Sequence, residues 1–186
     1  MGESQPRKAR SADLEALPAH VIGELIDGEL YASPTPALPY AMAAAELFGE
    51  LSGPFTKGRG GPGGWRLLSE PELRLGGDVL VPDIAGWRRE RMPRTPRRAA
   101  TSLAPDWVCE VLSPSTRALD RKAKPPVYAR AGVRYMWMLD PDARTLEVFR
   151  LEGSRYHPLE SHSGQVSIRA EPFTALELEA AILWEE

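Results

Sequence analysis

The eight-residue stretch PDWVCEVL, residues 105–112, decides the predicted fold. It is mostly apolar and rich in β-prone side chains, which is typical of a strand buried inside a sheet. On both sides of it, segments with strand character alternate with segments that have helical spacing. We therefore expect an α/β (α+β) fold in which a central mixed β-sheet is flanked by helices.

An N-terminal β-hairpin is expected within residues 21–32, because Asp27-Gly28 separates two β-prone runs there and favours a two-residue turn. A second hairpin is expected within 65–87, around Gly76-Gly77-Asp78. Apolar spacing and terminating residues predict helices at about 40–51, 122–131 and 176–184, and strands at 134–140, 145–151 and near 156–159.

Length and composition indicate one domain. The chain has 186 residues, of which 42% are hydrophobic, so it can bury a substantial core. Residues 1–12 offer little to bury and are expected to form a disordered tail before a single domain at 13–186. A single cysteine, Cys109, excludes a disulfide framework and a multi-cysteine zinc site. No secretory signal and no long apolar run are visible, so we expect a cytoplasmic protein without a membrane partner.

Two acidic residues occupy positions that should be buried. Alternation along 79–87 places Asp83 on the same strand face as apolar residues, directly after a proline. Glu110 lies in the middle of the strand 105–112 and shares a face with Val108 and Leu112.

A buried carboxylate costs several kcal/mol unless it is paired or bound to a metal. A divalent cation between the two acids would satisfy both, since Mg²⁺ is commonly held by one or two carboxylates with water and phosphate. Two separate salt bridges to Arg or Lys at the strand ends are the alternative, and the pattern alone leaves both open.

Positive charge is concentrated in two segments, although the formal net charge is −3. Residues 88–98 carry six Lys or Arg against one acid, and residues 117–134 carry the same excess. Each segment follows one of the two acids along the chain, an order that suits phosphodiester chemistry. The expected nucleic-acid contacts are Arg88, Arg89, Arg117 and Arg121, with a solvated surface as the alternative for either segment.

A longer ordered set of residues resembles a known family. Pro82-Asp83 followed by Glu110 resembles the PD-(D/E)XK nuclease superfamily. The run 105–116 and the opening hairpin 24–34 are similar to the Uma-type family of bacterial restriction endonucleases. Further matching positions are Asp120, Lys124, Tyr128, Gly132 and Asp140-Pro141.

This resemblance implies a restriction-endonuclease-like core with the site at one edge of the sheet. Asp83 and Glu110 would then bind Mg²⁺ or Mn²⁺. The superfamily usually places its lysine two residues after the second acid, where this chain has Leu112. Lys124 is the matching family position instead, and it would orient the attacking water or stabilise charge on the phosphate.

Because Pro125 follows Lys124, we expect that lysine just ahead of the helix, with Lys122 as a possible substitute. Accessory roles are open for Glu24, for Glu72 and for Tyr40, which stands where the family often has histidine.

The function predicted in this way is metal-dependent hydrolysis of DNA by an endonuclease, with Asp83, Glu110 and Lys124 as the catalytic residues. A nuclease-fold protein that binds nucleic acid or a protein partner without cutting is the alternative. A homodimer would suit cleavage of both DNA strands.

Overall fold

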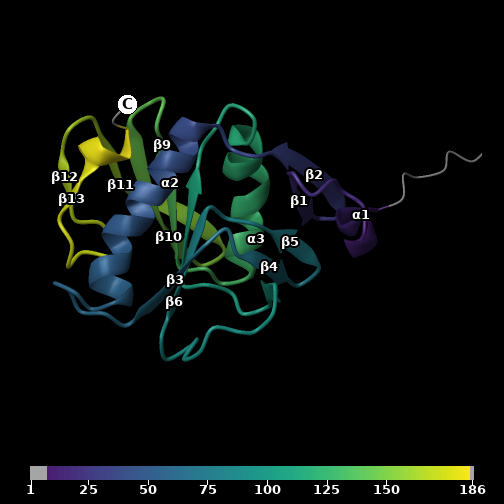
Figure 1. Ribbon diagram of the computed structural model, residues 1–186, viewed down its shortest axis with the longest axis horizontal. Coiled ribbons are helices and arrows are strands. Elements are labelled where there is room, and N and C mark those ends of the chain that lie inside the picture. Colours follow the sequence, from purple (N-terminus) through teal and green to yellow (C-terminus); the bar gives the residue numbers. More distant parts are fainter. Residues whose placement is uncertain (1–7, 185–186) are drawn as a thin grey trace, which may run out of the picture.

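The computed structural model describes residues 8–184, which form two main β-sheets with helices packed against them (Figure 1). The larger sheet has the strand order β11-β10-β9-β8-β6-β3, and β8 (Trp107–Val111) is the strand expected from PDWVCEVL. β8 runs parallel to β9 and antiparallel to β6, so the sheet is mixed, as predicted. The other strands of this sheet are β3 (Trp65–Ser69), β6 (Ile84–Arg88), β9 (Tyr135–Asp140), β10 (Thr145–Glu152) and β11 (Arg155–Ser163).

The smaller sheet begins with the predicted N-terminal hairpin. Asp27 and Gly28 both adopt positive φ, 52° and 85°, as a two-residue turn requires. The strand order is β2-β1-β5-β4-β7. Its strands are β1 (Val21–Ile26), β2 (Glu29–Pro34), β4 (Glu72–Leu75), β5 (Asp78–Leu80) and β7 (Ala100–Thr101).

The hairpin expected within residues 65–87, with its turn at Gly76-Gly77, is confirmed, because its two arms keep one antiparallel register from Trp65↔Arg88 to Leu75↔Asp78. The expectation of a hairpin within one sheet differs from the structure, which divides it between two sheets. β3 pairs with β6 in the larger sheet, whereas β4 and β5 form a hairpin of the smaller sheet. The chain crosses from β5 to β6 at Val81-Pro82-Asp83, where proline has no N–H to donate to a strand partner. Asp83 therefore lies in the crossing between the two sheets and not in the middle of a strand.

The two faces of the larger sheet carry separate hydrophobic clusters. On one face, Trp107 and Cys109 of β8 pack in the cluster that contains Leu47 of α2 (Leu38–Leu51). On the other face, Val108 packs in the cluster that contains Val127 of α3 (Lys124–Arg130). Alternation along β8 turns Glu110 toward this second face, so the acid is directed at α3.

The helical segments differ in detail from the expectation. A π-helical turn, η2 (Leu119–Ala123), runs directly into α3, and Lys124 is helical with φ −69° and ψ −43°. Lys124 is thus the first residue of the helix and does not precede it. Another π-helical turn, η1 (Ser52–Thr56), continues α2.

The predicted C-terminal helix at 176–184 is also wrong. Leu178–Glu179 form β13, which pairs with β12 (Ser167–Ile168), and Ala180–Leu183 form a short 3₁₀ turn, η3. At the other end, α1 (Ser11–Glu15) begins inside the segment assigned to a tail, and residues 1–7 of that tail lie outside the described residues. Within 8–184, none of the helices is long and apolar enough to cross a membrane.

Candidate active site

Four carboxylates and one ammonium group meet where the two sheets and α3 join. They are contributed by four different elements and by the crossing before β6, and we call them the carboxylate–lysine cluster. Its members are Glu24 of β1, Asp83 of the crossing, Glu110 of β8, Asp120 of η2 and Lys124 of α3. The cluster therefore depends on the tertiary fold and not on one local motif.

Lys124 is the cation of the cluster. Its Nζ lies 3.1 Å from Glu24 Oε1, 3.1 Å from Glu110 Oε2 and 2.9 Å from Asp120 Oδ1. The lysine side chain is only 4% exposed. Asp120 precedes Lys124 by four residues along the continuous helical segment, which brings the two side chains to one face.

Glu110 is fully buried, and both of its carboxylate oxygens have partners. Oε2 accepts a hydrogen bond from Lys124, and Oε1 accepts one from the hydroxyl of Tyr128 at 2.5 Å. Of the two salt bridges that the sequence left open, Glu110 forms one, with Lys124 and not with a residue at a strand end, whereas Asp83 forms none within residues 8–184. The counter-charge of Glu110 comes from the start of α3.

Asp83 is held at the edge of the same cluster by backbone groups. The Val111 N–H donates to Asp83 Oδ2 at 2.6 Å, and the Glu70 N–H donates to the Asp83 carbonyl oxygen at 2.9 Å. Glu24 is likewise fixed from the crossing, since the Val81 N–H donates to its Oε1 at 2.8 Å. The break between β5 and β6 thus orients two carboxylates.

The cluster holds more negative than positive charge in a buried place. Burial raises the pKa of Glu110 well above 4.5, and the nearby Lys124 charge only partly opposes this. Burial also raises the pKa of Asp83 to about 6, against the Val111 hydrogen bond and the Lys124 charge. Burial tends to lower the pKa of Lys124, but Glu110, Glu24 and Asp120 raise it well above 10.5. Lys124 is therefore a cation in this arrangement.

The donor set suits a hard divalent cation. Carboxylate oxygens are the protein ligands that Mg²⁺ and Mn²⁺ prefer, and one ammonium leaves most of the carboxylate charge uncompensated. A cavity of about 40 Å³ is lined by Asp83, Glu24, Asp120 and Lys124, which is enough for a small ion or a water. Across residues 8–184, however, no three acidic, His or Cys side chains already stand in ligating geometry, and Lys124 takes up one oxygen of Glu110. A cation at Glu110 would therefore share this oxygen with Lys124, which is possible because each carboxylate oxygen has two lone pairs.

A groove of about 470 Å³ leads away from Asp83. Its walls come from the β2–α2 connection and α2, including Thr35, Ala44 and Phe48, and from Glu70 before β4. Asp83 lines both this groove and the smaller cavity, so it lies between the buried cluster and the surface.

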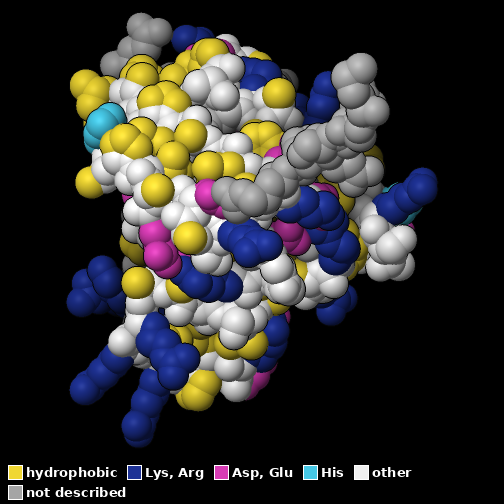
Figure 2. Space-filling model, turned by 90° about the vertical axis from the view of Figure 1, so that its right-hand side faces the viewer, with side chains coloured by type: hydrophobic (Ala, Val, Ile, Leu, Met, Phe, Trp, Pro, Cys, Tyr) yellow, Lys and Arg dark blue, Asp and Glu magenta, His cyan; other side chains and the backbone are white. Residues whose placement is uncertain are grey.

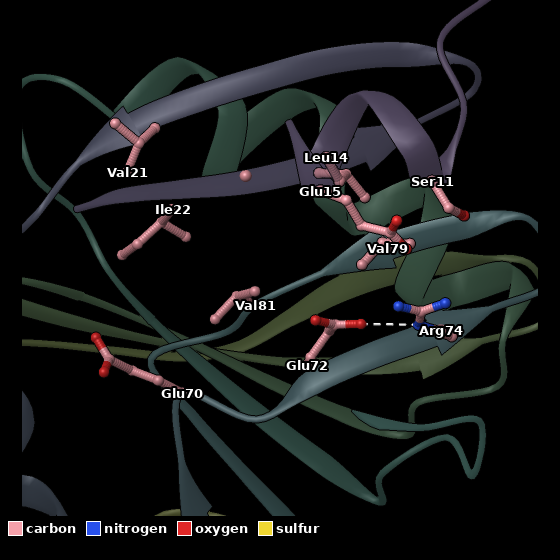
Figure 3. A pocket seen from close by; sticks show the side chains of 11 residues that line it. Ser11, Leu14, Glu15, Val21, Ile22, Glu70, Glu72, Arg74, Val79 and Val81 are labelled. Atoms are coloured by element: carbon pink, nitrogen blue, oxygen red, sulfur yellow. Dashed lines mark hydrogen bonds and ion pairs between the residues drawn. The ribbon is translucent and has the colours of Figure 1, made fainter. Parts of the chain in front are cut away.

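Three of the accessory candidates lie outside the cluster. Glu72 forms an ion pair with Arg74 at 2.7 Å in a separate pocket of about 400 Å³ (Figure 3). The Tyr40 hydroxyl donates to Asp142 Oδ2 at 3.0 Å. Lys122 is exposed and lines another groove with Met136 and Phe149. Of the accessory residues, the structure brings only Glu24 to the acids.

The four arginines expected beside the acids do not lie together. Arg88 is at the far end of β6, with its guanidinium 4.1 Å above the Trp65 ring, and the Arg89 guanidinium donates to the Thr56 carbonyl oxygen at 2.6 Å. Arg117 pairs with Asp140, and Arg121 pairs with Glu147. Arg117 and Arg121 belong to the segment that carries Asp120, whereas Arg88 and Arg89 do not approach the cluster.

Asp120 and Tyr128 are the site residues that sequence reasoning left without a role. Both were noted only as matching family positions. The four-residue spacing from Asp120 to Lys124, and again from Lys124 to Tyr128, could have indicated one helix face.

Comparisons with known proteins agree with this fold. A crystal structure described as a "putative nuclease belonging to DUF820", from Anabaena variabilis ATCC 29413, matches with a TM-score of 0.74 and 22% sequence identity over 94% of this chain and 96% of that chain. Comparison with curated proteins finds no match. The model of the Uma2 family, described as "Putative restriction endonuclease", matches residues 12–182. The chain belongs to the Uma2 family, as its motifs predicted.

Proposed function

We propose that this protein is a metal-dependent endonuclease that hydrolyses phosphodiester bonds of DNA. The observation that carries the proposal is the carboxylate–lysine cluster, in which four largely buried carboxylates face one buried ammonium. Stability is a weak explanation for this arrangement, because replacement of buried ion pairs by apolar packing of similar volume is often neutral or stabilising.

In this proposal, Asp83 and Glu110 hold the divalent ion, Mg²⁺ or Mn²⁺. When bound, the ion supplies a Lewis acid and lowers the pKa of coordinated water. The position of Asp83 at the junction of the cavity and the open groove supports this role, because a phosphate can approach there. Glu110 anchors the buried side and is oriented by Tyr128.

Lys124 acts as a fixed positive charge. Its raised pKa keeps it protonated, so it can donate hydrogen bonds to water or phosphate but cannot accept a proton as a general base. Glu24 and Asp120 hold the ammonium from two sides at 3.1 and 2.9 Å. This pre-orientation makes it suited to stabilise negative charge that develops on a phosphate.

Arg117 and Arg121 are the proposed phosphate contacts on the same helical segment as Asp120. Both are already paired with acids at 38% and 35% side-chain exposure, so they would have to exchange these partners for phosphate oxygens. A homodimer would suit cleavage of both DNA strands. Light scattering after size-exclusion chromatography measures the molar mass in solution and so tests this.

The test is cleavage of supercoiled plasmid with Mg²⁺ or Mn²⁺. Wild type should convert the plasmid to open-circular or linear DNA, and chelation by EDTA should stop it. Asp83→Asn and Glu110→Gln should abolish cleavage, while the exposed Glu177→Gln, which affects only a surface ion pair with Arg169, serves as the matched control. Cleavage retained by both Asp83→Asn and Glu110→Gln contradicts the assignment.

A nuclease-fold protein that binds without cutting is the second candidate. The contact of Lys124 with Glu110 favours it, because the ammonium already compensates carboxylate charge that a metal would otherwise compensate. Calorimetric titration with Mn²⁺ separates the two candidates. Binding that is lost in Asp83→Asn supports the enzyme, and absence of binding together with absence of cleavage supports the second candidate.

A further inference from the structure

Two loops at the end of β6 away from the carboxylate–lysine cluster concentrate positive charge. Residues 57–64 and 88–98 together contain eight Lys or Arg and a single acid, Glu90. We call their exposed basic residues the cationic pole: Lys57, Arg59, Arg89, Arg91, Arg94, Arg97 and Arg98. The reaction centre proposed above uses none of them.

The two loops of the cationic pole are joined by hydrogen bonds. The Arg89 N–H donates to the Gly64 carbonyl oxygen at 2.9 Å, and its guanidinium donates to the Thr56 carbonyl oxygen at 2.6 Å. These contacts fix both ends of the glycine-rich loop against the start of the arginine-rich one. The charges of the two loops therefore form one surface.

The arginine-rich loop is braced from inside. Arg66 donates to the carbonyl oxygens of Met92 and Pro93, at 3.1 and 2.8 Å, and to the Thr95 hydroxyl at 3.0 Å. The Met92 side chain is buried in the cluster beneath. A loop held in this way loses little conformational entropy when it binds a partner.

Most charges of the cationic pole are unpaired. Arg91 forms an ion pair with Asp106, but the side chains of Lys57, Arg59, Arg94, Arg97 and Arg98 form no ion pair or hydrogen bond with any part of the chain that the structure describes. In Figure 2, Lys and Arg side chains project from the lower end of the molecule, where Figure 1 places the loop between β6 and β7.

Arg89, at the start of the arginine-rich loop, is separated from Asp83 by the length of β6. Five strand residues at about 3.3 Å each correspond to roughly 16 Å. The Arg89 end of the cationic pole therefore lies away from the reaction centre, whereas the other end of the loop returns to β7, which pairs with β4. This separation does not prevent contact with another stretch of the same polyanion.

We propose that the cationic pole binds the phosphate backbone of nucleic acid away from the point of cleavage, which rests on the proposed nuclease function. Unpaired arginines on a braced loop are suited to sequence-independent phosphate contacts. An anionic membrane is disfavoured because membrane-binding loops combine cations with exposed apolar anchors. The exposed large hydrophobic residues, Leu38, Met42 and Val166, lie elsewhere in the sequence, and Met92 of this loop is buried.

The test compares two triple variants with the same charge change. One is Arg94→Gln/Arg97→Gln/Arg98→Gln in the cationic pole. The control is Arg150→Gln/Arg155→Gln/Arg169→Gln, which removes three exposed or half-exposed arginines elsewhere. Binding of each protein to a long duplex oligonucleotide is measured by fluorescence anisotropy in EDTA over a series of NaCl concentrations, and circular dichroism checks the fold.

The pole variant should bind at least ~10-fold more weakly than wild type near 100 mM salt, and the slope of log K against log salt should decrease by about 2–3, since each phosphate contact contributes about 0.9. The control variant should keep the wild-type slope. Equal slopes for all three proteins would overturn the proposal. The proposal would also be overturned if the pole variant lost binding to phosphatidylserine vesicles but bound DNA as wild type does.

Because EDTA prevents metal-dependent cleavage, the binding result is independent of the proposed activity. A normal salt response in a wild-type protein that cuts no DNA would overturn the nuclease but not the cationic pole. Plasmid cleavage by wild type, together with equal salt slopes for wild type and both variants, would overturn the cationic pole but not the nuclease.

Discussion

Replacing Lys124 with methionine should destabilise the folded protein by about 3–5 kcal/mol near pH 7.5, the usual cost of leaving a buried charge without its partner. The lysine is 4% exposed, and its Nζ lies within 3.1 Å of three carboxylates. Methionine keeps most of the side-chain length but removes the charge. The loss of stability is smaller than the sum of three ion pairs, because buried carboxylates left without a counter-charge take up protons instead of staying charged.

The deficit of Lys124→Met should shrink as the pH falls toward 5. Burial raises the folded-state pKa of Glu110 and of Asp83, so the folded state binds protons at a higher pH than the unfolded chain does. Stability contributed by such groups rises as the pH falls through the raised pKa. Removal of the ammonium raises both values further and strengthens this trend.

Urea unfolding followed by tryptophan fluorescence measures the free energy of unfolding of each variant. Lys122→Met is the matched control, because that lysine is exposed and should change stability by less than about 0.5 kcal/mol. Addition of Glu110→Gln to Lys124→Met should recover part of the loss. If Lys124→Met unfolds within about 0.5 kcal/mol of Lys122→Met at pH 7.5, the ammonium is not the counter-charge of the cluster.

Three further outcomes follow from named contacts. Above pH 6, Asp83→Asn should raise the free energy of unfolding by about 1–3 kcal/mol, because it removes a carboxylate whose pKa burial raises from 3.8 to about 6, while plasmid cleavage is lost. Tyr128→Phe removes the hydrogen bond to Glu110 and should cost about 1–3 kcal/mol in urea unfolding. Burial tends to raise the pKa of Asp140, but the hydrogen bonds from Arg117 outweigh this effect and lower it. Asp140→Asn should therefore destabilise at neutral pH, and its difference from wild type should disappear as the pH falls below about 4, which acid unfolding monitored by circular dichroism can measure.

The sequence predicted those parts of the fold that depend on local signals. The Asp27-Gly28 turn and the buried strand β8 are specified by residues adjacent in the chain, and both are confirmed. The division of this hairpin between two sheets at Pro82-Asp83 was missed because both the apolar alternation and the pairing of its two arms, β3–β4 and β5–β6, continue through the crossing. The C-terminal segment was missed because Leu178 pairs with Ile168, a contact that helical spacing cannot reveal.

Those residues of the site that match single positions of the family pattern could be predicted from the sequence. The structure places Glu110, Lys124 and Asp83 in one cluster, although Asp83 reaches it from a crossing and not from a strand face. Arg88 and Arg89 were misplaced for a simple geometric reason. Residues that follow an acid along a strand are carried to the opposite end of the sheet, so nearness in sequence does not imply nearness in space.

The central claim, that Asp83 and Glu110 together bind the divalent ion, is tested most directly by anomalous diffraction from crystals soaked in Mn²⁺. A manganese peak should lie in contact with the carboxylates of both residues in wild type. The peak should be absent from Asp83→Asn crystals under the same conditions. Manganese bound only at surface carboxylates such as Glu72, or no manganese at a saturating concentration, would contradict the account.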